Sequence, residues 1–257
     1  MMDLSAVGTG HLRALREKLK VGRLADPLTR WDAAEVPALV GLGCAEAARL
    51  LDAVLAERAR AIPAPQLVWT GPAPLHAAML DTAVTLKQLF HRARRRVLVA
   101  GYSFDHGREI FAPLHAAMVQ HGVTTDFFLH VPVADHERAA LRAPDTRAAL
   151  VRRKLGDFLA ENWPGAPYPT LHYDPRPLEG PIWASLHAKC VVVDEAEALV
   201  TSANFTHRGH DRNVEVGALI RDPRYAGALA AQWRNAQAQG MFVRFDDTLK
   251  AAAPATR

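Results

Sequence analysis

The sequence predicts an α/β protein in which a mixed β-sheet is flanked by helices and preceded by a small helical appendage. Three observations carry this prediction: apolar residues recur at helical spacing before residue 60, a proline-containing connector follows, and short apolar strands then alternate with helical stretches. With 257 residues and 49% hydrophobic content, the chain is long enough to bury a substantial core.

The first sixty residues form the expected appendage. Apolar residues recur at helical spacing from Leu12 to Leu19 and from Ala45 to Ala59, and prolines and glycines separate the two stretches. The connector Ile62–Pro65 contains two prolines, which exclude helix and hold the chain extended. The expected domains are the appendage over residues 1–62, a main domain over 66–245 and a tail over 246–257.

Strands and helices alternate in the main domain, which is typical of a sheet covered by helices. The expected strands are Leu67–Trp69, Val97–Tyr102, Thr124–Val131, Ser185–Val193, Ala198–Ser202 and Asn213–Ile220. The expected helices are Leu75–Arg94, Arg108–His121, polar helical structure within Ala134–Pro169, and Pro223–Gln239. The last helix ends at Gly240, because glycine readily takes the left-handed conformation that stops a helix.

Composition narrows the classes of partner and compartment. The net charge is +4, and 25 arginines outnumber six lysines. Arginine suits bidentate phosphate contacts, although an alanine- and arginine-rich composition explains the count equally well. Cys44 and Cys190 lie far apart and predict no disulfide, hence a reducing compartment. With no secretory h-region and no apolar run of about 20 residues, we expect a cytoplasmic protein without a membrane partner.

One segment combines residues suited to phosphoryl chemistry. In Ser185–Asp194, His187 and Lys189 stand two residues apart at the mouth of an apolar strand, so their side chains share a face. A neutral imidazole can attack phosphorus, and a neighbouring ammonium neutralises the oxygens as charge builds in the transition state. Such a pair needs no metal and no cofactor, so we expect neither.

Two later segments add polar groups to the same face. Ser202 and Asn204 stand where the next strand ends in a turn, and their hydroxyl and amide groups suit phosphate oxygens. Asn213 and Glu215 open a further strand, and a carboxylate there can hold an imidazole in its productive tautomer. An isolated His-Lys pair is more often structural, but this ordered set predicts one site.

His187-x-Lys189-x4-Asp194, followed by Ser202-x-Asn204 and Asn213-x-Glu215, resembles the phospholipase D superfamily over about residues 66–245. The resemblance implies a phospholipase D-like fold and a phosphodiesterase that acts through a phosphohistidine. It also implies the following roles: His187 is the nucleophile, Lys189 and Asn204 bind phosphate, Ser202 supports it, Glu215 orients His187, and Asn213 completes the substrate-binding set. The family commonly has glycine where this chain has Thr201.

Two features of the motif qualify this reading. Asp194 belongs to the catalytic motif, but after seven residues of strand and turn it need not face the phosphate, so a structural role is expected. The first half of the chain has no second copy, since neither Lys87 nor Lys154 has a histidine two residues before it. Single-motif relatives pair as homodimers, so we predict a two-fold dimer in which two copies of His187 face each other.

More narrowly, the helical front with Leu39–Gly43, the single late motif and the phrase Leu199–Asn204 resemble the phospholipase D-like component of the DISARM phage-defence system. The resemblance implies a nuclease or DNA-processing component, with DNA and other DISARM proteins as partners. Two alternatives stay open: a phospholipid hydrolase of the same mechanism, and a non-catalytic DNA-binding or scaffold component of the defence complex.

Residues outside the motif offer further candidates. Tyr102 ends a first-half strand whose end faces the site. The loop His207–Arg212 could contact a nucleic-acid backbone or could simply be exposed. The arginines of Arg92–Arg96 lie at a helix C-terminus, where cations complement the helix dipole, although phosphate binding is the alternative.

Overall fold

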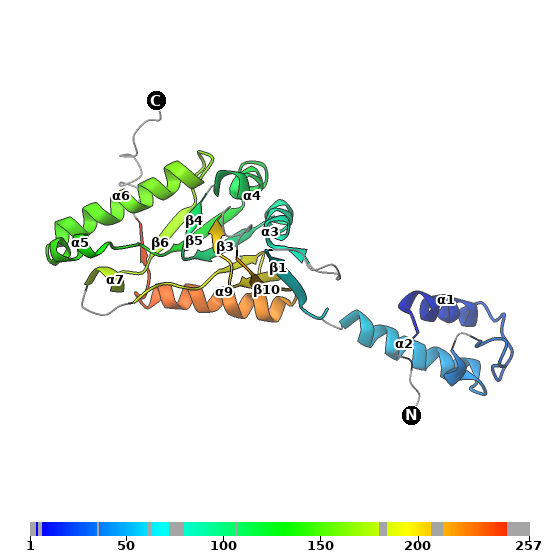
Figure 1. Cartoon of the computed structure of the whole chain (residues 1–257). Coiled ribbons are helices and arrows are strands. Elements are labelled where there is room, and N and C mark those ends of the chain that lie inside the picture. The colour runs from blue at the N-terminus through cyan, green and yellow to red at the C-terminus, as the bar shows by residue number, and fades with distance from the viewer. Residues whose placement is uncertain are drawn as a thin grey trace. The chain divides into compact units, whose positions relative to one another are not determined.

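A computed structural model describes residue 4 and residues 7–34, 36–60, 63–71, 80–105, 107–179, 184–206 and 213–245. The chain divides into two compact units, residues 1–62 and 63–257, each taken by itself below (Figure 1). In the described part of the chain, no helix is long and apolar enough to cross a membrane.

The first unit is helical. It contains α1 (Thr9–Lys20), a short 3₁₀ turn (Pro37–Leu39) and α2 (Cys44–Arg60). Three leucines of α1, at i, i+3 and i+7, are buried: Leu12, Leu15 and Leu19. They form a core with Leu39 of the turn and Leu51 of α2, because helical spacing places them on one face.

A bidentate ion pair joins the two helices of this unit. The Arg16 guanidinium donates to both carboxylate oxygens of Asp52, at 2.7 Å each. Arg16, one of the basic residues of α1, is therefore paired within this unit. Because Asp52 is largely exposed, we expect the pair to contribute little to stability.

The second unit is built on a nine-stranded mixed sheet with the order β11-β6-β5-β3-β7-β8-β10-β1-β2. Its strands are β1 (Gln66–Thr70), β2 (Leu80–Asp81), β3 (Arg96–Gly101), β5 (Thr124–Leu129), β6 (Thr170–Tyr173), β7 (Cys190–Val193), β8 (Glu197–Thr201), β10 (Glu215–Ile220) and β11 (Val243–Arg244). β3, β5 and β6 are parallel to one another, whereas β7, β8, β10 and β1 alternate in direction.

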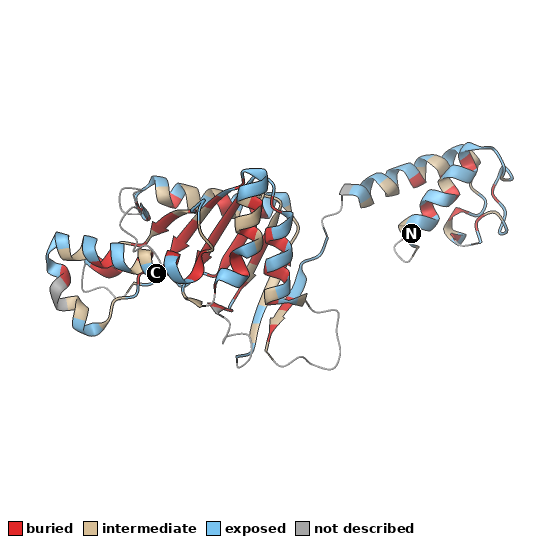
Figure 2. Ribbon diagram, turned by 90° about the horizontal axis from the view of Figure 1, so that it is seen from above, coloured by how far each residue is buried: buried red, intermediate tan, exposed pale blue. Residues whose placement is uncertain are grey.

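Helices cover both faces of this sheet (Figure 1). One face carries α3 (Thr82–Arg92), α4 (Gly107–His121) and α6 (Pro144–Asn162), and the other carries α9 (Pro223–Ala238). Short helical segments occupy Asp135–Arg138 (α5), Ala139–Arg142 (η2) and Arg176–Glu179 (α7). Buried residues fill the strands between the helical layers (Figure 2), so two apolar clusters lie on opposite faces.

The predicted fold class is confirmed, with differences at element boundaries. The helix expected over Leu75–Arg94 begins at Thr82, because the Asp81 carboxylate accepts the Val84 N–H and caps it; residues 72–79 lie outside the described residues. The strand expected from Ser185 forms its ladder only from Cys190. The strand β6 was not predicted, because four residues are too few to show periodicity.

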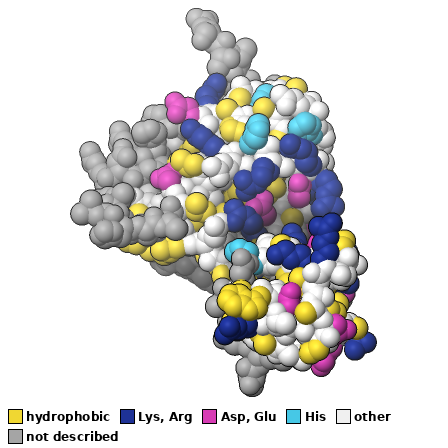
Figure 3. All heavy atoms as spheres, turned by 90° about the vertical axis from the view of Figure 1, so that its right-hand side faces the viewer, with side chains coloured by type: hydrophobic (Ala, Val, Ile, Leu, Met, Phe, Trp, Pro, Cys, Tyr) yellow, Lys and Arg dark blue, Asp and Glu magenta, His cyan; other side chains and the backbone are white. Residues whose placement is uncertain are grey.

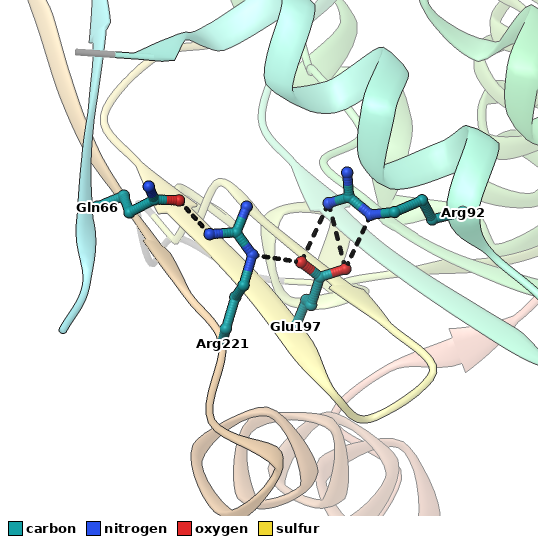
Figure 4. Close-up of polar contacts among 4 residues, drawn as sticks. All are labelled: Gln66, Arg92, Glu197 and Arg221. Carbon is teal, nitrogen blue, oxygen red and sulfur yellow. Dashed lines mark hydrogen bonds and ion pairs between the residues drawn. The ribbon is translucent and has the colours of Figure 1, made fainter. Parts of the chain in front are cut away.

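An arginine network ties four elements together (Figure 4). Glu197, at the start of β8, accepts from Arg92 of α3 at 3.0 Å and from Arg221, just after β10, at 2.9 Å. Arg221 also donates to the side chain of Gln66, the first residue of β1. One arginine of the run 92–96 therefore joins α3 to the sheet.

Candidate active site

The predicted site residues gather at one edge of the sheet. β3, β5, β6 and β8 end at this edge, and the antiparallel β7 and β10 begin there. His187 and Lys189 precede β7, Ser202 and Asn204 follow β8, and Glu215 is the first residue of β10. The directions of β7, β8 and β10 therefore bring these three segments, which are separated in sequence, to the same edge of the sheet.

His187 and Lys189 are in direct contact. The Lys189 ammonium lies 3.1 Å from Nδ1 and 3.2 Å from Nε2 of the His187 ring, and it donates to the His187 carbonyl at 2.9 Å. An ammonium can donate only to a ring nitrogen that carries a lone pair. At most one of the two contacts with the ring is therefore a hydrogen bond, and an imidazole with a free lone pair is the form able to attack phosphorus.

The two side chains differ in burial. His187 is exposed, whereas Lys189 is only 6% exposed. Burial lowers the pKa of Lys189 below its ordinary value, and the nearby Glu215 carboxylate opposes this shift. A poorly hydrated ammonium beside an accessible imidazole interacts strongly with any anion that reaches it.

The turn after β8 is shaped by Thr201. Its hydroxyl oxygen accepts the Ala203 N–H at 3.0 Å, which closes a tight turn around Ser202. On the facing strand β10, Gly217 pairs with Thr201, and a Cβ added to Gly217 would stand 2.8 Å from the Thr201 Cβ. The absence of a side chain at Gly217 therefore makes room for threonine at position 201.

Glu215 lies at the centre of a short polar chain. The Ser202 hydroxyl donates to one carboxylate oxygen and accepts the Val216 N–H at 3.1 Å. The Asn213 amide lies 3.5 Å from the other oxygen. In the part of the chain that the structure describes, no hydrogen bond joins Glu215 to His187. The structure thus brings Ser202, Asn213 and Glu215 together, and the orienting role of Glu215 toward His187 stays a prediction.

Asn204 is held by a second, two-stranded sheet. β9 (Phe205–Thr206) pairs in parallel with β4 (Phe104–Asp105), directly after the end of β3. The buried Oδ1 of Asn204 has no hydrogen-bond partner among the described residues. A phosphate oxygen needs a donor, which in this side chain is Nδ2 rather than Oδ1, so the phosphate-binding role of Asn204 stays a prediction.

Asp194 lies at the other end of β7, about 20 Å of extended chain from His187. Its carboxylate accepts three backbone N–H groups, from Arg94 at 2.9 Å, Arg95 at 2.8 Å and Arg96 at 2.9 Å. Its φ of 54° lies in the left-handed region. The structure does not bring Asp194 to the other motif residues; it uses the carboxylate to fasten the β7–β8 turn to the start of β3.

Two aromatic rings continue the site toward β5. Tyr102, directly after β3, stands 4.8 Å from His187 between ring centroids, and the Lys189 ammonium lies 5.4 Å from the Tyr102 ring centre. Tyr102 also stacks on His130, which follows β5, with centroids 4.7 Å apart. His130 was not singled out from the sequence; its position just after a strand that ends beside β3 was the available signal.

A cavity of about 360 Å³ opens beside His187 and Lys189. His187, Lys189 and Ser202 line one side of it, and the apolar side chains of Leu229 and Trp233 on α9 line the other. A phosphate at the first side would therefore place an attached apolar or aromatic group against α9.

Some residues considered from the sequence are not placed. The loop 207–212, with its histidines and arginines, lies outside the described residues. Within the described ranges, no group of three or more His, Cys, Asp or Glu side chains is arranged to hold a metal ion.

Comparison with known proteins agrees with this fold and motif. Residues 86–236, more than half of the chain, match the family model described as "Cardiolipin synthase, PLD-like domain". The chain therefore belongs to the phospholipase D-like family, and the resemblance noted in the sequence is confirmed.

Individual proteins are also similar to this chain. The DISARM protein DrmC of Bacillus paralicheniformis is 27% identical over 157 residues, which cover 60% of this chain and 56% of DrmC. The chain thus aligns with little more than half of that protein. Among solved structures, Nuc from Salmonella typhimurium matches 72% of this chain and 99% of its own, at 17% identity and a TM-score of 0.44. The phosphatidylserine synthase of Haemophilus influenzae matches 81% and 49%, at 16% identity and a TM-score of 0.48.

Proposed function

We propose that this protein is a phosphodiesterase that cleaves nucleic acid through a phosphohistidine at His187. The observation that carries the proposal is the buried Lys189 ammonium held against both ring nitrogens of an exposed His187. This pair places an imidazole nucleophile and a positive charge at one point. The similarity to DrmC supports a role in phage defence, with DNA and other DISARM proteins as partners.

The reaction has two steps. A ring nitrogen of His187 attacks phosphorus, the bond from phosphorus to the leaving oxygen breaks, and that oxygen departs with the electron pair and takes up a proton. Water then attacks phosphorus and passes a proton to a general base, the P–N bond breaks, and its electron pair returns to the imidazole. In both steps Lys189 neutralises the non-bridging oxygens, and Asn204 supplies an amide beside them.

Nucleic acid is the substrate we favour. Figure 3 shows arginine and lysine side chains at the surface, interspersed with acidic and hydrophobic side chains. Cationic groups of this kind bind a phosphate backbone without reading its sequence. Plasmid nicking and oligonucleotide cleavage assays, with single- and double-stranded substrates, test the assignment directly.

Trapping the intermediate tests the mechanism. After incubation with DNA labelled at the scissile phosphate and a rapid quench, we expect label on His187 that is stable to base and labile to acid. His187→Asn should abolish both label and cleavage, whereas His121→Asn, at the end of α4, is the matched control and should keep both. Cleavage by a clean preparation of the His187 variant would refute the nucleophile.

The apolar wall of the cavity keeps a phospholipid substrate as the second candidate. Leu229 and Trp233 could hold an acyl chain as readily as a base. A liposome hydrolysis assay run beside the plasmid assay separates these substrates. A non-catalytic scaffold would instead retain DNA in a strongly salt-dependent manner that His187→Asn leaves unchanged.

The two-fold dimer stays a prediction. It would place a second His187 opposite the first, and that second copy would protonate the leaving oxygen. Sedimentation at micromolar concentration tests it, since a fully active monomer would show that the chain does not need a second copy.

A further inference from the structure

A second imidazole stands beside His187 within the same chain. His130 and His187 contact the same aromatic ring, Tyr102, at centroid distances of 4.7 and 4.8 Å. All three lie at the sheet edge where β3 and β5 end and β7 begins. The centroids of the two imidazoles therefore lie no more than about 9.5 Å apart.

The environment of His130 selects its neutral form. Burial lowers its pKa, the buried carboxylate of Asp174 opposes the shift, and the neighbouring His187 adds to it. Asp174, just after β6, is fully buried and accepts from the Arg176 guanidinium at 2.6 and 2.8 Å. Its charge is therefore largely committed to Arg176, and the groups facing His130 leave it uncharged.

One ring nitrogen of His130 remains unused. Nδ1 is buried and has no hydrogen-bond partner in the described part of the chain, although the side chain as a whole is only half-buried. The accessible edge of the ring is therefore the one away from Nδ1, which carries Nε2. A neutral imidazole with an accessible nitrogen beside a phosphate site is a suitable proton acceptor.

We infer that His130 is a catalytic residue that accepts the proton of the water that hydrolyses the phosphohistidine on His187. This inference rests on the proposed function. In that step the water oxygen bonds to phosphorus, the P–N bond breaks with its electron pair returning to His187, and the water proton moves to His130. The chain then supplies the base for the second step itself, without a second subunit.

A chromogenic phosphodiester, bis(4-nitrophenyl) phosphate, isolates this step. Nitrophenolate is a good leaving group and needs no acid, so its burst reports formation of the phosphohistidine, while the later linear phase reports hydrolysis. The full-length chain should show both phases. His130→Phe keeps a ring to stack on Tyr102 but has no acceptor, so we expect a normal burst and a linear rate that falls about 100-fold.

Two further variants separate chemistry from packing. His130→Ala should be slow in the same phase, and added imidazole should restore hydrolysis at least tenfold, since the small side chain leaves space for it. The exposed His121→Phe is the matched control and should keep both phases.

The outcomes discriminate clearly. A linear rate in His130→Phe within threefold of the natural protein would overturn the inference. Loss of the burst in a folded His130→Phe protein would also overturn it, because His130 would then only position His187. By contrast, a burst in His187→Asn would overturn the proposed function itself, so the two failures are distinguishable.

Discussion

Replacing Asp194 tests whether this motif residue stabilises the fold or takes part in the reaction. Its carboxylate accepts three backbone N–H groups at 2.8–2.9 Å, all at the end of β7 remote from His187. Asp194→Asn keeps Oδ1, the oxygen that accepts the Arg95 and Arg96 N–H groups. It replaces Oδ2, the acceptor of the Arg94 N–H, with an NH₂ group that can only donate. Because a hydrogen bond to a charged acceptor contributes about 1.5–3 kcal/mol, we expect this variant to lose about 1–3 kcal/mol of unfolding free energy.

Asp194→Ala removes all three acceptors and places a side chain other than Asp or Asn at a φ of 54°. We expect it to lose about 3–5 kcal/mol, of which about 1 kcal/mol is the cost of the left-handed conformation. Asp194→Gly is the matched control, because it removes the carboxylate without that cost and should therefore be about 1 kcal/mol more stable than the alanine variant.

Urea titration measures these differences as shifts of the midpoint at constant slope. The rate of substrate cleavage per folded molecule should stay within about twofold in Asp194→Asn, since no reacting group moves. A variant of unchanged stability that has lost cleavage by two orders of magnitude or more would show that the reasoning is wrong and that Asp194 takes part in the reaction.

Three further predictions concern the site edge. Glu215→Gln removes the charge beside Lys189 and should lower the cleavage rate about 10–100-fold with little change in substrate affinity, as steady-state kinetics would show. Gly217→Ala should cost about 1–3 kcal/mol in urea titration, because its Cβ would stand 2.9 Å from the Val200 carbonyl oxygen. His130 has a lower pKa folded than its unfolded value of about 6.5, so the unfolded chain binds more protons there and stability should fall as the pH drops through 6.5. His130→Phe should weaken that dependence in pH-resolved unfolding curves; an identical dependence in the variant would contradict the assignment.

The sequence predicted the fold class because the main strands and helices are long enough to show periodicity. It missed elements that only tertiary pairing defines, such as β6 and the two-residue strands β2 and β4. The helix expected from Leu75 instead begins at Thr82, where Asp81 caps it. The apolar pattern extends across this boundary, so periodicity alone did not locate the start of the helix.

The candidate site was predictable where the chemistry follows one strand and less so where it depends on neighbours. The spacing of His187 and Lys189 indicated their shared face, and their contact follows from it. His130 carries no local pattern, because its relation to His187 exists only through the order of strands in the sheet and through the ring of Tyr102. The buried environment of its Nδ1 is likewise a property of the packed molecule.

The pairing of β4 with β9 makes the chain segments after β3 and after β8 inseparable in protein engineering. Phe104 and Phe205 are register partners and stack with ring centroids 5.4 Å apart; Phe104 lies two residues after Tyr102, and Phe205 lies directly after Asn204. A loop grafted from a relative in place of only one of these segments would lack the ring that it packs against. Exchange of substrate preference between family members should therefore succeed only when residues 102–105 and 202–206 are transplanted together.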